Sequence, residues 1–231
     1  MRLVLWDVDG TLMNSRGTIR HARVQALRAV YGLDGEIRRV AGGGMTDPQL
    51  TLETLLAHGW AEPAAIERLD AFRDAYLEGL HAARDTLTAD LEVLPGVPET
   101  IERLHELGVA QSLLTGNYEP AARLKVSAAG LDRRLDFELG AFGSDNRDRL
   151  CLVPVALEKA RRRLHPSMNA GDIVVIGDSP RDIACARAGG ARAVAVATGP
   201  HPVEELATFH PDALLERLSD TDATIAALLG R

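Results

Sequence analysis

The amino-acid sequence predicts an α/β fold in which a doubly wound, mainly parallel sheet carries an inserted helical domain. Short apolar runs, at residues 3–6, 109–114, 172–177 and 193–197, alternate with amphipathic segments of helical period. Runs of this kind are typical of strands that helices cover on both faces of a sheet. Between about residues 18 and 85 the alternation stops and only helical periodicity remains, which indicates the insertion.

The first strand, residues 3–6, ends abruptly in the run Asp7-Val8-Asp9-Gly10-Thr11. Two carboxylates at the exit of a buried strand repel each other and lose hydration unless a positive group lies between them. A divalent cation is the usual group of this kind. The run therefore indicates a metal or phosphate site, while a turn or capping role for one aspartate is the plainer alternative.

The helical insertion follows this strand directly. We expect residues 1–14 and 95–231 to form the core and residues 15–94 to form the inserted domain, here called the cap, because glycine and proline occur near both joints. Apolar residues at helical spacing predict three helices within the cap, over residues 19–27, 46–56 and 63–80.

A glycine-rich loop, Gly42-Gly43-Gly44-Met45-Thr46-Asp47, joins two of these cap helices. Glycine lets a backbone approach a ligand closely, and the hydroxyl of Thr46 is a hydrogen-bond donor. Gly43, Gly44 and Thr46 are therefore candidates for substrate recognition. A flexible joint between two helices is the competing interpretation.

The core resumes with a helix over residues 98–107 and a strand over 109–114, which ends in Thr115-Gly116-Asn117. A hydroxyl, an unhindered glycine N–H and an amide then lie at the start of the next helix, where they suit a phosphate group. An ordinary helix N-cap is the plainer alternative.

The strand over residues 172–177 ends in Asp178-Ser179-Pro180-Arg181-Asp182, and Pro180 suits the first turn of a helix. Asp182 would in the plainer interpretation only place a favourable charge near that helix N-terminus. The remaining elements expected in the core are a short strand at 137–140, a helix at 152–164, strands at 193–197 and 213–215, and a helix at 223–229.

These motifs converge if the sheet is parallel. Ligands of doubly wound sheets bind at the carboxyl ends of the strands, near a switch in strand order. All the candidate polar groups of the core fall at such ends, namely Asp7, Asp9, Thr115, Gly116, Asn117, Asp178 and Asp182. The sequence therefore predicts one composite site for a metal and a phosphate group.

The motifs resemble, in order and placement, those of the haloacid dehalogenase-like hydrolase superfamily, in its phosphatase, phosphoglycolate phosphatase-like branch. Residues 7–11 match its first motif, residues 114–117 its second and residues 177–182 its fourth. The resemblance implies a Rossmann-like core with an inserted helical cap. It also implies Mg²⁺-dependent hydrolysis of a small phosphorylated metabolite through an aspartyl-phosphate.

The resemblance also implies roles for individual residues. Asp7 would be the nucleophile and Asp9 the general acid and base. Mg²⁺ would bind Asp7, the backbone carbonyl of Asp9 and Asp178, with support from Asp182. The phosphoryl oxygens would be held by Thr115, Gly116, Asn117 and Lys125.

The third family motif is a lysine, and here the chain departs from the commonest pattern. The region expected to carry it, residues 143–149, contains no lysine. We assign the role to Lys125, in the helix after Thr115, and keep Arg147 and Arg149 as substitutes. A surface lysine on an amphipathic helix is the plainer interpretation of Lys125.

Several other functions stay open. Asp9 favours phosphate-ester chemistry over dehalogenation and phosphonate hydrolysis, whose enzymes lack an acid at this position. A phosphomutase keeps this acid and needs a cap that grips a second phosphate, for which Arg38 and Arg39 are available. A non-catalytic phosphate-binding regulatory domain is a further alternative, and a receiver-like phospho-acceptor ranks last.

The composition and charge of the chain limit the classes of partner that we expect. A net charge of −7 without a basic stripe argues against nucleic acid as a partner. No apolar run is long enough to span a membrane, so no membrane association is expected. The two cysteines, Cys151 and Cys185, are expected to be reduced, as in a cytoplasmic protein. We expect a monomer or a small homo-oligomer.

Overall fold

The core is a six-stranded parallel sheet in the computed structural model, which describes residues 2–38, 40 and 42–231. The strand order is β5-β4-β1-β6-β7-β8, and every neighbouring pair is parallel. The predicted α/β class is confirmed. The strands are β1 (Leu3–Trp6), β4 (Ala110–Thr115), β5 (Ala141–Phe142), β6 (Ile173–Gly177), β7 (Arg192–Val196) and β8 (Ala213–Leu215).

Helices cover both faces of this sheet because successive strand residues point to opposite faces and both sets are apolar. Val4 and Trp6 of β1 belong to one cluster, with α6, α7 and α11, whereas Leu3 and Leu5 belong to another, with α8, α9 and α10. The helices are α6 (Val97–Glu106), α7 (Glu119–Ala128), α8 (Leu152–Arg163), α9 (Pro180–Ala188), α10 (Val203–Ala207) and α11 (Thr221–Leu229).

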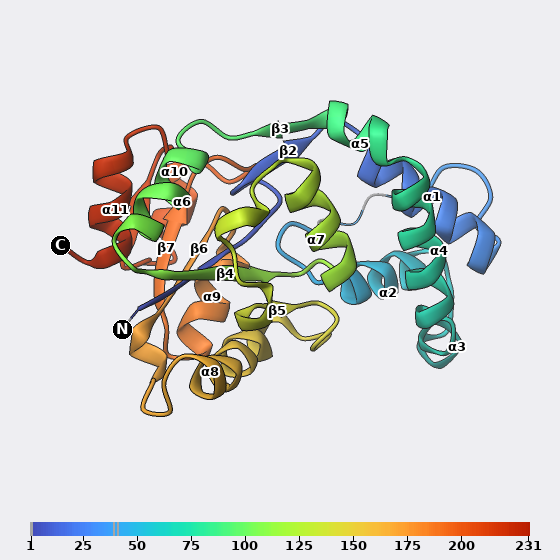
Figure 1. The fold of residues 1–231 in the computed structure, drawn as a ribbon. Helices are drawn as coiled ribbons and strands as arrows, with labels where there is room; N and C mark the ends of the chain where they lie inside the picture. The colour runs from blue at the N-terminus through green and yellow to red at the C-terminus, as the bar shows by residue number, and fades with distance from the viewer. Residues whose placement is uncertain (1, 39, 41) are drawn as a thin grey trace.

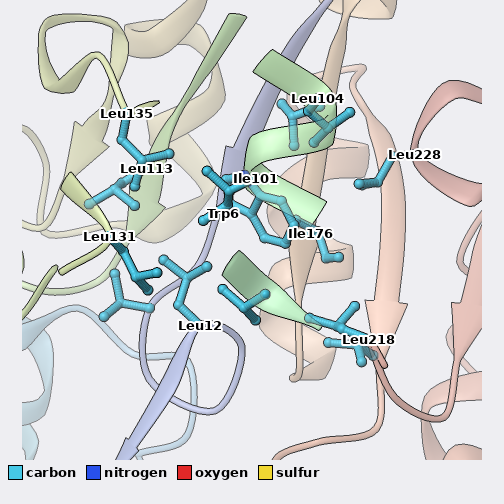
Figure 2. Packing of buried hydrophobic residues seen from close by; sticks show 14 of the residues in the cluster. Trp6, Leu12, Ile101, Leu104, Leu113, Leu131, Leu135, Ile176, Leu218 and Leu228 are labelled. Carbon is cyan, nitrogen blue, oxygen red and sulfur yellow. The ribbon is translucent and has the colours of Figure 1, made fainter. Parts of the chain in front are cut away.

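The first cluster is centred on Trp6, which is fully buried. Figure 2 shows its ring among residues from several elements, including Ile101 of α6 and Ile176 of β6. Its indole N–H donates to the side-chain oxygen of Gln111, 3.2 Å away, so the one polar atom of this ring is satisfied inside the core. The packing fixes β1 at the centre of the sheet.

Strand order brings the motif ends together. The chain runs from β1 outward through β4 and β5 on one side and then through β6, β7 and β8 on the other. This order reverses at β1, which lies between β4 and β6. The carboxyl ends of these three strands therefore meet at the switch point, where doubly wound sheets bind ligands.

The inserted segment forms a helical layer, and its hydrophobic cluster extends to Tyr118, Ala121 and Leu124 of the core. The cap helices are α1 (Thr18–Tyr31), α2 (Asp47–Ala57), α3 (Glu62–Glu67), α4 (Leu69–Ala82) and α5 (Arg84–Asp90), and they gather to the right of the sheet in Figure 1. Leu27, Leu55, Phe72, Tyr76 and Leu80 form the buried centre of this layer. Among the described residues, no helix is both long and apolar enough to cross a bilayer.

Some sequence-based expectations differ from the structure. The single helix expected over 63–80 is divided at Arg68 into α3 and α4, and α5 was not predicted because Leu87 is its only buried residue. The strand expected at 137–140 is a 3₁₀ turn, and the strand follows as β5. The 3₁₀ turns are Asp132–Arg134, Phe137–Leu139, Arg149–Cys151 and Ala170–Asp172.

A short antiparallel ribbon connects core and cap. It consists of β2 (Met13–Ser15) and β3 (Leu91–Val93), so the outgoing and returning chains lie side by side. The joints expected at 14–15 and 94–95 fall in this ribbon or next to it. Figure 1 shows the ribbon leading from the sheet to the cap helices.

Asp90 fastens this ribbon to the start of α1. Its Oδ2 accepts hydrogen bonds from the Ser15 hydroxyl at 2.7 Å and from the backbone N–H groups of Gly17 and Thr18 at 3.0 and 2.9 Å. Desolvation opposes its ionisation, but these hydrogen bonds prevail and lower the pKa of Asp90 to about 2. Asp90 thus acts as the N-cap that the residue before α1, Gly17, cannot supply.

We predict that Asp90→Ala lowers the free energy of unfolding by about 1–2 kcal/mol, because it leaves helix N–H groups unsatisfied. The loss should be present at pH 7 and shrink as the pH falls towards 2, since Asp90 stabilises the fold only while ionised. Urea unfolding measures both effects, and Glu92→Ala on β3 is the matched control. An equal loss in both variants would contradict this capping role.

Candidate active site

A cavity of about 1050 Å³ lies where the carboxyl ends of the central strands face the cap. Helix α1 and the loop before α2 form its cap wall. The core side chains and glycines that line it include most of the predicted set, namely Asp7, Asp9, Gly10, Thr115, Gly116, Asn117, Lys125, Arg149 and Asp178. The structure therefore brings together the ends of β1, β4 and β6 as the sequence predicts.

Asp7 begins where β1 ends, and its N–H donates to the carbonyl of Ile176 on β6 at 2.9 Å. Its side chain is almost fully buried and lies 3.3 Å from the guanidinium of Arg149. Burial raises the pKa of Asp7 to about 6, with Asp182 and Asp9 adding to the rise and Arg149 opposing it. Asp7 is thus a fixed, poorly hydrated carboxylate aimed at the cavity.

Asp9 has a different environment from Asp7. Its side chain is 44% exposed and forms an ion pair with Lys125, whose Nζ lies 2.7 and 2.9 Å from its two oxygens. The Asn117 amide donates to the same carboxylate at 2.9 Å. Although desolvation opposes ionisation, Lys125 and Asn117 hold the pKa of Asp9 below its usual value. Asp9 is therefore held as a carboxylate.

Lys125 is committed to this network. Its side chain is 2% exposed, and Nζ donates to both oxygens of Asp9 and to Oδ1 of Asn117 at 2.6 Å. These three contacts match the three protons of an ammonium group. In the structure Lys125 lines the cavity and its immediate partners are Asp9 and Asn117, and its expected role towards the phosphoryl oxygens stays a prediction.

The second motif forms a tight turn after β4. Thr115 is buried, and its Oγ accepts a hydrogen bond from the Asn117 N–H at 3.3 Å. A Cβ at Gly116 would overlap the carbonyl oxygen of Met45 in the cap loop. Only glycine therefore allows the backbones of cap and core to come together here.

Asp178 and Asp182 follow β6 and take separate positions. Asp178 lines the cavity and accepts a hydrogen bond from Thr11 at 3.2 Å. Burial, reinforced by Asp7 and Asp182, raises the pKa of Asp178 to about 8. Asp182 lies behind it and accepts from the Ser179 N–H and hydroxyl in a capping box of α9. Asp182 therefore does stabilise the N-terminus of α9, as the plainer interpretation of the sequence had it.

Three carboxylates form a candidate cation site among the residues that the structure describes. Oxygen atoms of Asp7, Asp178 and Asp182 lie within 4.8 Å of one another. Asp182 accepts hydrogen bonds from Ser179 and Arg149 and does not line the cavity, whereas Asp7 and Asp178 do, so these two carboxylates are the ones accessible to an ion there. Oxygen ligands of this kind suit a hard divalent cation.

Arg149 supplies the positive charge behind these acids. It belongs to the 3₁₀ turn before α8, is 4% exposed and contacts both Asp7 and Asp182. Its other terminal nitrogen donates to the carbonyl of Gly44 at 2.9 Å. Arg147, the second substitute considered for the missing lysine, is exposed, and its backbone carbonyl accepts the hydrogen bond from Thr46. The sequence did not distinguish these two arginines, which are only two residues apart.

The glycine-rich cap loop packs on the core. Gly43 and Gly44 line the cavity, and their carbonyls accept hydrogen bonds from Arg181 and Arg149. The expectation that Thr46 contacts the substrate is not supported. Thr46 is fully buried, donates to the Arg147 carbonyl at 2.6 Å and caps α2 through the N–H of Gln49. Its hydroxyl is used within the fold.

Two further contacts were not foreseen from the sequence. Asp47 pairs with Arg23 of α1 and accepts from the Tyr118 N–H at 2.8 Å, which ties the cap to the second motif.

Arg38, considered above for a second phosphate, does not line the cavity and instead donates to the Ala57 carbonyl at 3.0 Å. Arg39 lies outside the described residues.

We predict that the metal-free protein loses stability as the pH rises from about 5 to above 8. The folded-state pKa of Asp178 is raised, so the fold favours its protonated form, and ionisation at high pH opposes folding. Asp178→Asn should raise the free energy of unfolding at pH 8.5 by roughly 2–4 kcal/mol. Urea unfolding in EDTA measures this difference.

Exposed Asp85 provides the control for this measurement, as Asp85→Asn. Adding a divalent cation at pH 8.5 should stabilise the wild type more than Asp178→Asn, since binding to the native state alone raises stability. A wild-type protein whose stability rises between pH 5 and 8.5 in EDTA would contradict the raised pKa of buried Asp178.

The chain is similar in sequence to known hydrolases and phosphatases. The model of a family described as haloacid dehalogenase-like hydrolase matches residues 1–190. The chain is 26% identical to the pyrophosphatase PpaX of Anoxybacillus flavithermus, with 94% of this chain and 93% of the relative covered. It is 23% identical to a phosphoglycolate phosphatase of Vibrio parahaemolyticus, with 98% and 96% covered.

The fold is also found among solved structures. The crystal structure of a predicted phosphatase from Clostridium acetobutylicum matches with a TM-score of 0.73 at 17% identity, over 98% of this chain and 99% of the other. At this identity the likeness speaks for the fold alone. The shared fold includes the cap as well as the sheet, because nearly the full length of both chains is matched.

Proposed function

Because the chain belongs to the haloacid dehalogenase-like hydrolases, we propose that it is a phosphatase that hydrolyses a small phosphomonoester through a phosphoryl group held on Asp7. The observation that carries this proposal is the buried Asp7 carboxylate at the end of β1, with Arg149 at 3.3 Å and the Thr115 turn lining the same cavity. A carboxylate nucleophile divides one difficult displacement into two easier ones.

In the first step an oxygen of Asp7 attacks phosphorus, and the bond from phosphorus to the leaving oxygen breaks. Both reactants are anions, so positive charge and N–H or O–H donors must lie nearby. Arg149 faces Asp7 from the buried side, and the Thr115 hydroxyl and Gly116 N–H are the donors at the end of β4. We assign to Arg149 the charge-neutralising role for which the sequence offered Lys125, Arg147 and Arg149.

Asp9 handles the proton in both steps. It gives a proton to the leaving oxygen and later takes one from the water that hydrolyses the phosphoryl-aspartate. In the resting site Lys125 and Asn117 keep it ionised, which is the form a base needs. An arriving phosphate adds negative charge beside Asp9 and competes for Lys125, and both effects increase its affinity for a proton.

The donor set fits Mg²⁺. Asp7 and Asp178 present their carboxylates to the cavity, and the Asp9 carbonyl would complete the protein ligands. When bound, Mg²⁺ neutralises charge on the transferring phosphoryl group. Asp182 would hold Arg149 and Ser179 in place behind this set.

The proposal extends to the substrate, the cellular compartment and the oligomeric state. Relatives named for phosphoglycolate and pyrophosphate hydrolysis support a small phosphorylated compound as the substrate. Cys151 and Cys185 are free thiols, which suits a reducing compartment such as the cytoplasm. We propose a monomer or small homo-oligomer that acts there on a metabolite.

Phosphate release from an aryl phosphate, with and without Mg²⁺, tests the function. Wild type and Asp85→Asn should release phosphate in the presence of Mg²⁺, and Asp7→Asn should lose at least roughly 10³-fold in kcat because it lacks the nucleophile. Release that persists in Asp7→Asn would remove Asp7 from the mechanism. Formation of an isomer of the substrate in place of free phosphate would indicate a mutase.

Lys125→Met should lower kcat by roughly 10²–10⁴-fold, the usual contribution of a positioned acid and base. Without Lys125 the pKa of Asp9 rises, so the base form of Asp9 is lost at a higher pH. The acidic limb of the kcat profile should therefore move to higher pH in this variant. Lys159→Met, which removes a lysine outside the cavity, is the control. An unmoved acidic limb would contradict the role of Lys125.

A further inference from the structure

Asp178 lies in a narrow slot between the loops that follow two other strands of the sheet. In the strand order β1-β6-β7, the chain that leaves β6 at Asp178 has the exit of β1 on one side and the exit of β7 on the other. Parallel strands end at the same edge of a sheet, so these three exits meet there. Gly10, Asp178, Thr198 and Gly199 all line the cavity at this edge.

A glycine forms each side of this slot. A Cβ at Gly10 would lie 2.5 Å from Oδ2 of Asp178, and a Cβ at Gly199 would overlap the same oxygen. Gly10 has a φ of 84°, so its backbone also favours glycine, whereas Gly199 lies outside the left-handed region. At Gly199, glycine is therefore needed for the space that Asp178 occupies and not for the backbone conformation.

Thr198 joins the two sides of the slot. Its hydroxyl donates to the Gly10 carbonyl at 2.6 Å, which connects the exit of β7 to the exit of β1 beside Asp178. The end of β7 is itself fixed to β8, because the Ala197 N–H donates to the Leu215 carbonyl at 2.9 Å. The width of the slot therefore depends on the hydroxyl of Thr198.

The slot restricts the orientation of the Asp178 carboxylate. Its Oδ1 accepts from the Thr11 hydroxyl at 3.2 Å, and its Oδ2 lies against the two glycines. A rotation of the carboxylate would break the hydrogen bond or press an oxygen into the backbone. Because Mg²⁺ demands near-ideal octahedral geometry, a ligand that is already held in one orientation loses less freedom when the ion binds.

We propose that Gly199 and Thr198 are positioning residues for the divalent cation. Gly199 leaves the room that the Asp178 carboxylate occupies, and Thr198 fixes the loop on the opposite side of it. This inference rests on the cation site of the proposed function. Both residues act through Asp178, and groups that orient a metal ligand in this way contribute roughly 10- to 100-fold to metal affinity.

Binding of Mn²⁺ to the metal-free protein tests the proposal without turnover. Mn²⁺ takes the same kind of octahedral oxygen site as Mg²⁺, and electron paramagnetic resonance measures its free concentration. Gly199→Ala should weaken Mn²⁺ binding by roughly tenfold or more, because the added methyl group displaces Asp178. Gly79→Ala makes the same change in α4, where a Cβ meets Ala22 at an ordinary distance, and should bind Mn²⁺ like the wild type.

Thr198 variants test the other side of the slot. Thr198→Val removes the hydroxyl and keeps the branched shape, and it should weaken Mn²⁺ binding by roughly tenfold. Thr198→Ser keeps the hydroxyl and should restore most of the affinity. Equal affinities in these two variants would overturn the role of Thr198. If Gly199→Ala does not fold, this pair decides the proposal.

Urea unfolding in EDTA tests the contact between Gly199 and Asp178 in the absence of any cation. Gly199→Ala should lower the urea midpoint of the wild type, and it should lower the midpoint of Asp178→Ala by less, because the overlapping carboxylate is gone there. An equal shift in both backgrounds would place the clash elsewhere and overturn the slot.

Activity measurements separate this proposal from the function on which it rests. In phosphate release from an aryl phosphate, Gly199→Ala and Thr198→Val should raise the Mg²⁺ concentration that gives half the maximal rate, with a smaller change in kcat at saturating Mg²⁺. A wild type that needs Mg²⁺ and binds Mn²⁺, with both variants equal to it, would overturn the positioning proposal alone. A wild type that binds no Mn²⁺ and releases phosphate without Mg²⁺ would overturn the cation site as well.

Discussion

The buried guanidinium of Arg149 is the charge on which the site depends. It contacts Asp7 and Asp182. Oxygen atoms of these two carboxylates and of Asp178 lie within 4.8 Å of one another, so the three groups repel when ionised. Removing such charges from water is unfavourable unless they are paired and hydrogen bonded. The same side chain reaches the carbonyl of Gly44, so one residue balances the acids of the core and also positions the cap loop over them.

The contact between cap and core is built from backbone as much as from side chains. The Asp47 N–H donates to the Gly116 carbonyl at 2.6 Å, and Gly44 leaves no room for a Cβ beside Ser179. Thr46, which we expected to meet the substrate, joins this contact by donating to the Arg147 carbonyl. The cap loop is therefore held against the core by hydrogen bonds and by close approach of the two backbones.

The sequence predicted the core well because its signals are local. An apolar run followed by acids or by Thr115-Gly116-Asn117 identifies both a strand and its functional end, and parallel order then brings those ends together. The family membership and the hydrolase fold that the motifs suggested are confirmed. What the sequence could not decide depends on tertiary geometry. Arg149 and Arg147 have the same chemistry, and only the path of the 3₁₀ turn buries one and exposes the other.

The ribbon of β2 and β3 has a consequence for how the chain assembles. The cap separates β1 from its partner β4 in sequence, and closing so long a loop costs conformational entropy. Once β2 and β3 pair, the two ends of the insertion are about one strand spacing apart, ~4.8 Å. The loop that must be closed to pair β1 with β4 is then effectively much shorter than the sequence between them. The strand order of the sheet therefore does not depend on the length of the chain between β2 and β3.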